Sequence, residues 1–63
     1  MKVRDLKPGT KIDLGALFEI PAYVLSEPAE QPDGSVAIIV RRMEGIREVV
    51  DFASMDTDVS ALS

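Results

Sequence analysis

The chain has 63 residues, and its 11 acidic residues outnumber its 7 basic ones, which gives a formal net charge of -4. This length permits one small domain, residues 1–63, and excludes multidomain enzymes and large folds such as the TIM barrel. The sequence contains no His and no Cys, which excludes disulfides, thiolate chemistry, imidazole acid–base catalysis and ordinary zinc sites. Hydrophobic residues make up 46% of the chain, which is enough to build a core.

No stretch of the sequence is apolar over the ~20 residues that a transmembrane helix requires. Lys2 and Arg4, near the N-terminus, are not followed by the apolar segment of a secretory signal. We therefore expect a cytoplasmic protein that does not associate with membranes.

The first part of the chain predicts short strands separated by a tight turn. A short strand is expected around Lys2–Arg4, with Val3 and Leu6 as its apolar anchors. The segment Lys7–Thr10 reads Lys-Pro-Gly-Thr and predicts a turn, because proline fixes φ and glycine accepts a positive φ. The chain is expected to continue extended over Lys11–Leu14.

An alternating pattern then predicts a half-buried strand over residues 18–24. Its apolar positions, two residues apart, are Phe18, Ile20, Ala22 and Val24. Pro21 lies between them and cannot donate a ladder hydrogen bond, so we expect it at an edge or a bulge. The Pro- and acid-rich segment Pro28–Gly34 follows and predicts a long loop.

Ser35–Arg42 is the strongest predicted strand. Its consecutive, mostly β-branched apolar residues favour a central strand that is buried on both faces or has a partner over its outer face. Asp33-Gly34 before it is a hairpin signal. A second strand is expected over Ile46–Ala53. We expect Ile46, Val50 and Phe52 to point inward and Arg47, Val49 and Asp51 to point outward, while Glu48 breaks this alternation. Ser54–Thr57 then predicts a single helical turn with Ser54 as its cap, and Asp58–Leu62 a last short strand.

This order of elements resembles a five-stranded SH3-like β-barrel with one short helical turn before the last strand. A small β-sandwich or an open meander is the alternative. The layout is similar to the N-terminal domain of the elongation factor P family and to the KOW-type domains of ribosomal proteins. The segments that carry the resemblance are Lys7–Ile12, Ala22–Val24, Ser35–Arg41 and Val50–Phe52. In elongation factor P the loop before the third strand carries a modified basic residue, whereas Glu30–Ser35 contains no Lys or Arg, so translation-factor activity is not implied. In length and style the chain also resembles small bacteriophage proteins.

Catalytic and metal-binding motifs are not supported. Ser, Thr and Tyr nucleophiles lack a His to activate them, and the single glycine in Lys7–Thr10 does not make a phosphate-binding loop. Asp51, Asp56 and Asp58 form a carboxylate cluster in the sequence, but without the glycine-spaced pattern of a calcium loop they indicate a solvated turn. We expect a protein that is not an enzyme and that uses no cofactor and no metal.

Apolar residues predicted to face outward point to a protein interface instead. They are Ile39, Met43, Val49 and Met55. An exposed apolar stripe of this kind is typical of a protein-binding surface. A domain with so small a core often depends on oligomerisation for its stability. The sequence therefore predicts a non-catalytic protein-interaction module that self-associates or binds a protein partner, of bacteriophage or bacterial origin.

The basic residues support an alternative function, which is the binding of a nucleic acid or nucleotide. The candidate phosphate-binding residues are Arg41, Arg42, Arg47, Lys7 and Lys11. If the fold gathers them on one face, they favour a nucleic-acid-binding barrel. If it scatters them and exposes the apolar stripe, it favours the interaction module.

Overall fold

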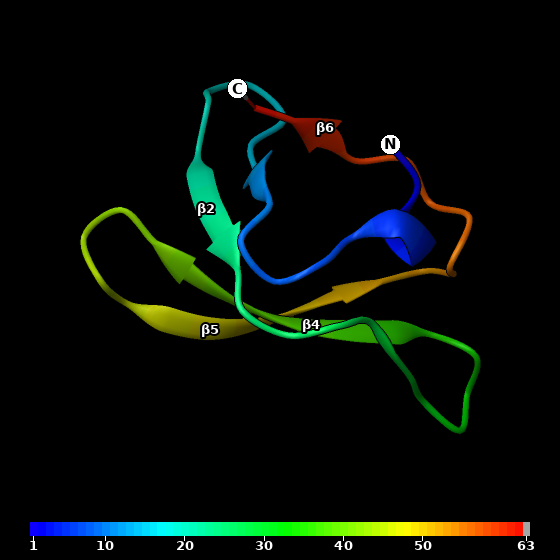
Figure 1. The fold of residues 1–63 in the computed structure, drawn as a ribbon. Coiled ribbons are helices and arrows are strands. Elements are labelled where there is room, and N and C mark those ends of the chain that lie inside the picture. The colour runs from blue at the N-terminus through cyan, green and yellow to red at the C-terminus, as the bar shows by residue number, and fades with distance from the viewer. Residues whose placement is uncertain (63) are drawn as a thin grey trace.

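The computed structural model describes residues 1–62, in which the chain folds as one antiparallel sheet that is not closed (Figure 1). The elements are the 3₁₀ turn η1 (Val3–Asp5) and the strands β1 (Lys11–Asp13), β2 (Pro21–Val24), β3 (Ala29–Glu30), β4 (Val36–Arg42), β5 (Arg47–Phe52) and β6 (Ser60–Ala61). The all-β class predicted from the sequence is therefore confirmed, with six strands in place of five. No helix within residues 1–62 is long and apolar enough to cross a membrane.

β4 is the central strand of the sheet. Along one edge it pairs with β5 over six residue pairs, from Val36↔Phe52 to Arg41↔Arg47. Along the other edge its first residues pair with β3 and its last residues with β2. β1 then pairs with β2, and β6 with β1, so that β5 lies at one end of the sheet and β6 at the other. Figure 1 shows the β4–β5 hairpin crossing beneath β1, β2 and β6.

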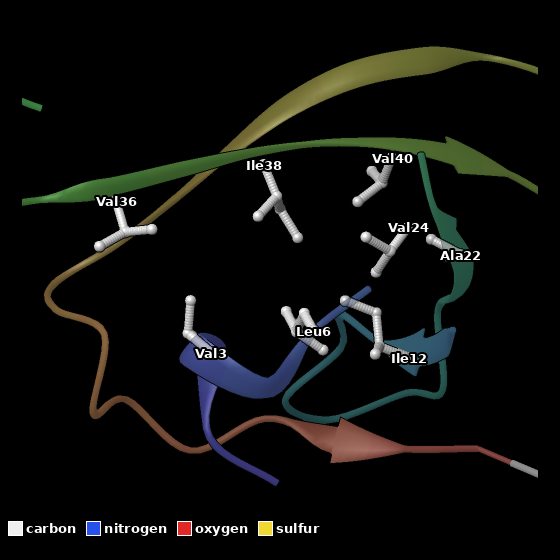
Figure 2. Packing of buried hydrophobic residues seen from close by; sticks show 8 residues of the cluster. All are labelled: Val3, Leu6, Ile12, Ala22, Val24, Val36, Ile38 and Val40. Atoms are coloured by element: carbon white, nitrogen blue, oxygen red, sulfur yellow. The ribbon is translucent and has the colours of Figure 1, made fainter. Parts of the chain in front are cut away.

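The core lies between the β4–β5 hairpin and the rest of the chain (Figure 2). Alternate residues of β4, namely Val36, Ile38 and Val40, are fully buried. The pairing along both edges confirms the predicted central position of the strand, but the expected burial on both faces is wrong within one chain, because Ile39 is 43% exposed. The buried side chains of β4 pack against apolar side chains from the other elements, which are Val3, Leu6, Ile12, Ala22 and Val24. No polar or charged residue of the described chain is buried with them.

The expected strand around Lys2–Arg4 is wrong, because this segment forms the 3₁₀ turn η1. Val3 and Leu6 are three residues apart and both are fully buried. In a strand, residues three apart point to opposite faces, whereas in a 3₁₀ turn they point to the same side. Only Lys2 makes a strand-like bridge, to Asp58.

The strand predicted over residues 18–24 is also partly wrong. β2 begins at Pro21, and the Phe18 side chain is 80% exposed. The preceding residues form a loop closed by a backbone hydrogen bond from the Leu14 N–H to the Ile20 carbonyl, at 2.9 Å. Pro21 is the first residue of β2 and lies opposite Asp13, the last residue of β1. The start of a strand suits proline, because proline has no N–H group to donate to a neighbouring strand.

The alternation expected for β5 is present: Arg47, Val49 and Asp51 are exposed, and Val50 and Phe52 are half-buried. The turn of the β4–β5 hairpin is closed by the Gly45 N–H donating to the Arg42 carbonyl, and Gly45 takes the positive φ of 92° that completes such a turn. Ile46 follows this glycine and lies opposite Arg42, on the predicted inner side, but it is exposed beyond the end of the core. Glu48, Val50 and Phe52 follow on the same side and are half-buried, so Glu48 is a polar residue in an otherwise apolar row.

Two smaller segments differ from expectation as well. The predicted long loop over Pro28–Gly34 contains the two-residue strand β3. The predicted helical turn at Ser54–Thr57 is a hydrogen-bonded turn without helix, in which the Ser54 hydroxyl accepts from the Asp56 N–H at 3.2 Å. The last predicted strand is present as β6, preceded by the bridge at Asp58.

Substitutions at neighbouring residues of β4 should differ sharply in their effect on the free energy of unfolding, because one side chain lies in the core and the next lies on the outer face. Ile38→Ala removes fully buried side-chain volume and should lower the free energy of unfolding by about 2–5 kcal/mol. Ile39→Ala, one residue later on the outer face, should lower it by less than about 1 kcal/mol. Urea denaturation at low protein concentration measures both values, and equal losses would contradict the orientation of β4.

Candidate interaction surface

The outer face of the β4–β5 hairpin, which points away from the core, carries an exposed apolar pair. Ile39 on β4 lies directly opposite Val49 on β5. Their exposed fractions are 43% and 64%, which is high for β-branched residues within a sheet. Residues directly opposite each other on one face are in contact distance, so the two side chains form one apolar spot.

Two further apolar residues, Met43 and Ile46, are exposed at the turn of this hairpin. Ile46 lies opposite Arg42, on the other side of the hairpin, so we define the hairpin patch as Ile39, Met43 and Val49. It contains three of the four residues predicted as partner-binding. The fourth, Met55, is half-buried and packs against the core, so it does not belong to the exposed surface.

β5 is also an edge strand with unpaired backbone groups. The Arg42 N–H donates to the Ile46 carbonyl, which sets the alternation of the ladder between β4 and β5. By that alternation, every second residue of β5 after Ile46 bonds to β4. The backbone N–H and C=O groups of Arg47, Val49 and Asp51 point away from β4, towards the free edge of the sheet.

A row of basic and aromatic side chains crosses the outer face of four strands. The register places Lys11 opposite Tyr23, Tyr23 opposite Arg41, and Arg41 opposite Arg47. We call these four residues the basic row. Among the described residues, none of its three cations forms an ion pair. Arg41 and Arg47 carry like charges at directly opposed positions, which is unfavourable without a counter-charge.

The other predicted phosphate-binding cations lie elsewhere. Arg42 points to the inner side of the sheet and its Nε donates to Glu48 Oε1 at 2.5 Å, which raises the pKa of the Arg42 guanidinium. This pair explains why Glu48 belongs to the inward row. Lys7 lines a separate pocket of about 310 Å³ with Arg4 and Glu27. The structure therefore gathers Arg41, Arg47 and Lys11 and separates Arg42 and Lys7 from them.

An open groove of about 610 Å³ lies between β5 and β6, on the inner side of the sheet. Half-buried apolar side chains line it, and they are Leu14, Val50, Phe52 and Val59. Four of its five charged residues make ion pairs or hydrogen bonds within the chain. Arg42 pairs with Glu48, Asp58 pairs with Lys2 at 3.0 Å, and Asp13 accepts hydrogen bonds from the backbone. Asp51 also lines the groove and makes no ion pair among the described residues, so the groove offers an apolar surface with one isolated carboxylate at its rim.

The loop beside this groove presents two apolar side chains that sequence reasoning did not single out. Leu17 is 91% exposed and Phe18 is 80% exposed. Asp13 holds the loop, because its Oδ1 accepts from the N–H groups of Gly15 and Ile20, each at 2.8 Å. Gly15 is required there, since a Cβ at this position would overlap the carbonyl oxygen of Phe18. The signal in the sequence was the Asp-x-Gly spacing of Asp13 and Gly15.

The carboxylates considered for a metal site are spread over the surface. Asp56 pairs with Arg4, whose Nε donates to it at 3.1 Å, and Asp58 pairs with Lys2. Residues 1–62 contain no group of three or more acidic side chains placed to hold an ion.

Comparison of the chain with protein-family models, with curated proteins and with solved structures finds no match. The interpretation of function therefore depends on the surface itself. The features that distinguish this surface are the hairpin patch, the free edge of β5 and the basic row.

The Asp13 contacts predict how stability depends on pH. The two backbone hydrogen bonds, that of Ile20 first, lower the pKa of the Asp13 carboxyl below its ordinary value. A lowered pKa in the folded state means that the stabilisation is complete above the unfolded-state pKa of about 3.9 and is lost as the pH falls through the folded-state value. Asp13→Asn should therefore lower the free energy of unfolding at pH 7 and make its fall below about pH 4 shallower.

Thermal or urea unfolding between pH 7 and pH 2 measures this effect. Asp5→Asn is the matched control, because the Asp5 carboxylate is exposed and makes no hydrogen bond or ion pair within the described chain. Identical pH profiles for the two variants would show that Asp13 does not hold the loop.

Proposed function

We propose that the protein is a non-catalytic interaction module that self-associates through the β4–β5 hairpin. One observation carries this proposal: an exposed apolar pair, Ile39 and Val49, lies directly beside a strand edge with unpaired backbone groups. An unpaired edge is a template for another strand, and apolar area beside it adds affinity. Both features belong to the same two strands, so one contact can use them together.

The polar groups of the chain support the proposal that the module is not catalytic. The sequence has neither His nor Cys, so nucleophiles lack their usual activating partners. Four of the five charged side chains of the groove between β5 and β6 are paired or hydrogen-bonded within the chain, and the fifth, Asp51, is an isolated carboxylate. Binding needs none of these groups to be reactive, whereas catalysis would.

We also propose that the fold is an SH3-like barrel variant, similar in layout to the N-terminal domain of the elongation factor P family and to KOW-type domains. The support is the strand order β5–β4–β2–β1–β6, in which all neighbouring strands are antiparallel and the last strand pairs with the first. β3 is then an addition within the loop between β2 and β4. Small barrels of this kind serve many functions, so this part of the proposal bears on architecture alone.

A second candidate function is binding of single-stranded nucleic acid along the basic row. The observation in its favour is that Tyr23 lies between Lys11 and Arg41 in the register, which combines a stacking platform with cations. The row has three cations on a chain whose net charge is -4, so it would give modest affinity. Self-association therefore remains the first proposal.

If the protein self-associates, its apparent mass should rise with protein concentration, and a single substitution in the hairpin patch should abolish this rise. Ile39→Lys places a charge in the hairpin patch and should raise the dimer dissociation constant by about tenfold or more, because the charge must be desolvated at the contact. Sedimentation velocity over a range of protein concentrations measures this constant.

Leu17→Lys is the matched control, because it makes the same change of charge at the exposed loop between β1 and β2. Its dissociation constant should stay within about twofold of the unchanged protein. If Leu17→Lys dissociates the protein and Ile39→Lys does not, the contact lies at the loop and the proposed surface is wrong.

The second candidate predicts weak, salt-dependent binding of a single-stranded oligonucleotide. With about three phosphate contacts, the logarithm of the binding constant should fall with a slope of about -2 against the logarithm of salt concentration. Arg41→Ala should reduce this slope by about 0.7, while Ile39→Lys should not reduce it. Fluorescence anisotropy of a labelled oligonucleotide measures the slope, and an unchanged slope for Arg41→Ala would reject the basic row as the site.

A further inference from the structure

The free edge of β5 is symmetric about Val49. Arg47 lies two residues before Val49 and Asp51 two residues after it, and the backbone groups of all three point away from β4. Their side chains lie on the outer face of the sheet, together with Ile39 and Arg41. A positive charge, an apolar centre and a negative charge therefore follow one another along one edge.

We propose that two copies of the chain pair antiparallel along β5, with Val49 opposite Val49 of the second copy on a two-fold axis. This inference rests on the self-association proposed above and specifies its geometry. In this register each of Arg47, Val49 and Asp51 exchanges both of its free backbone hydrogen bonds with the second copy. The two hairpins then form one continuous sheet, β4–β5–β5–β4, with both cores on its inner side.

Charge complementarity fixes this register. Arg47 comes opposite Asp51 of the second copy, and Asp51 opposite Arg47. Within one chain Arg47 faces the like charge of Arg41, while Asp51 faces Ala37, and neither forms an ion pair among the described residues. The second copy therefore supplies the counter-charge that the Arg41–Arg47 pair lacks.

Other registers lose this complementarity. A shift of two residues in one direction places Arg47 opposite Val49, and a shift in the other direction places Asp51 opposite Val49. A shift of one residue turns the backbone groups of one edge away from those of the other. Parallel pairing in register would place Arg47 beside Arg47 of the second copy and Asp51 beside Asp51 of the second copy, and both pairs of like charges repel.

The apolar side chains of the outer face agree with the same register. Val49 of each copy lies next to the other, and Ile39 flanks it on each side, so the row Ile39–Val49–Val49–Ile39 crosses the two-fold axis. The exposed fraction of Val49, 64%, is removed from water at the centre of the contact. Charged side chains and proline protect an edge strand against pairing with a copy of itself. β5 contains no proline, and its two outward-facing charges, Arg47 and Asp51, are opposite in sign, so in this register they attract their partners in the second copy.

Charge reversal tests the register. Arg47→Asp gives each copy two negative charges at the edge, and Asp51→Arg gives each copy two positive charges. Each single variant should raise the dimer dissociation constant by about tenfold, and the double variant Arg47→Asp/Asp51→Arg should return to within about threefold of the unchanged protein. The two single variants, mixed in equal amounts, should form a heterodimer, because their edges are then complementary.

Sedimentation velocity measures the dissociation constants, and native mass spectrometry identifies the heterodimer by its mass. Lys7→Asp makes the same change in net charge as Arg47→Asp at a site away from β5 and should leave the dimer within about twofold. Circular dichroism melting curves verify that each variant is folded, which we expect because the side chains of Arg47 and Asp51 are exposed.

The outcomes separate this inference from the function on which it rests. If the unchanged protein dimerises but neither the double variant nor the mixture recovers the dimer, the register is wrong while self-association stands. The same conclusion follows if the single variants dimerise as well as the unchanged protein. If the unchanged protein stays monomeric at all concentrations up to the millimolar range, both the proposed function and this inference fail.

Discussion

The pairing of β4 along both of its edges is the constraint on which the rest of the structure depends. β5 occupies one edge and β2 and β3 the other, so the register of β4 sets the position of the strands beside it. Its buried residues, of which Ile38 is the largest, form one wall of the core, and the chain around η1, β1 and β2 supplies the facing side chains. The same alternation sends Ile39 and Arg41 outward, so the exposed surface is a direct consequence of how the core is filled.

The small size of the chain explains why this surface remains incomplete in one copy. A chain of 63 residues buries a modest share of its surface, and here the sheet is not closed. β5 is therefore left with a free edge, next to a like-charged pair at Arg41 and Arg47 and an apolar pair at Ile39 and Val49. A second copy that pairs with β5 would satisfy the backbone, bury the apolar pair and balance the charges in a single contact. In this account, association extends the same hydrogen-bonded ladder that folds the hairpin.

The parts of the fold that depend on local periodicity could be predicted from the sequence. The β-branched run Val36–Val40 and the turn ending at Gly45 identify the β4–β5 hairpin, and the outward orientation of Val49 follows. The parts that depend on tertiary contacts could not. Val3 and Leu6 are buried together because η1 packs against the core, which the short N-terminal sequence does not reveal. The exposure of Phe18 depends on hydrogen bonds from Gly15 and Ile20 to Asp13, and the register that aligns the basic row requires the folded sheet.

Amide hydrogen exchange along β5, followed residue by residue by NMR at several protein concentrations, tests the central claim most directly. At low concentration the amides of Glu48, Val50 and Phe52 should be protected by β4, while those of Arg47, Val49 and Asp51 should exchange freely. As the concentration rises, the second group should become protected in step with the increase in mass. If the mass increases while the amides of Arg47, Val49 and Asp51 stay unprotected, the copies meet at another surface and the account is contradicted.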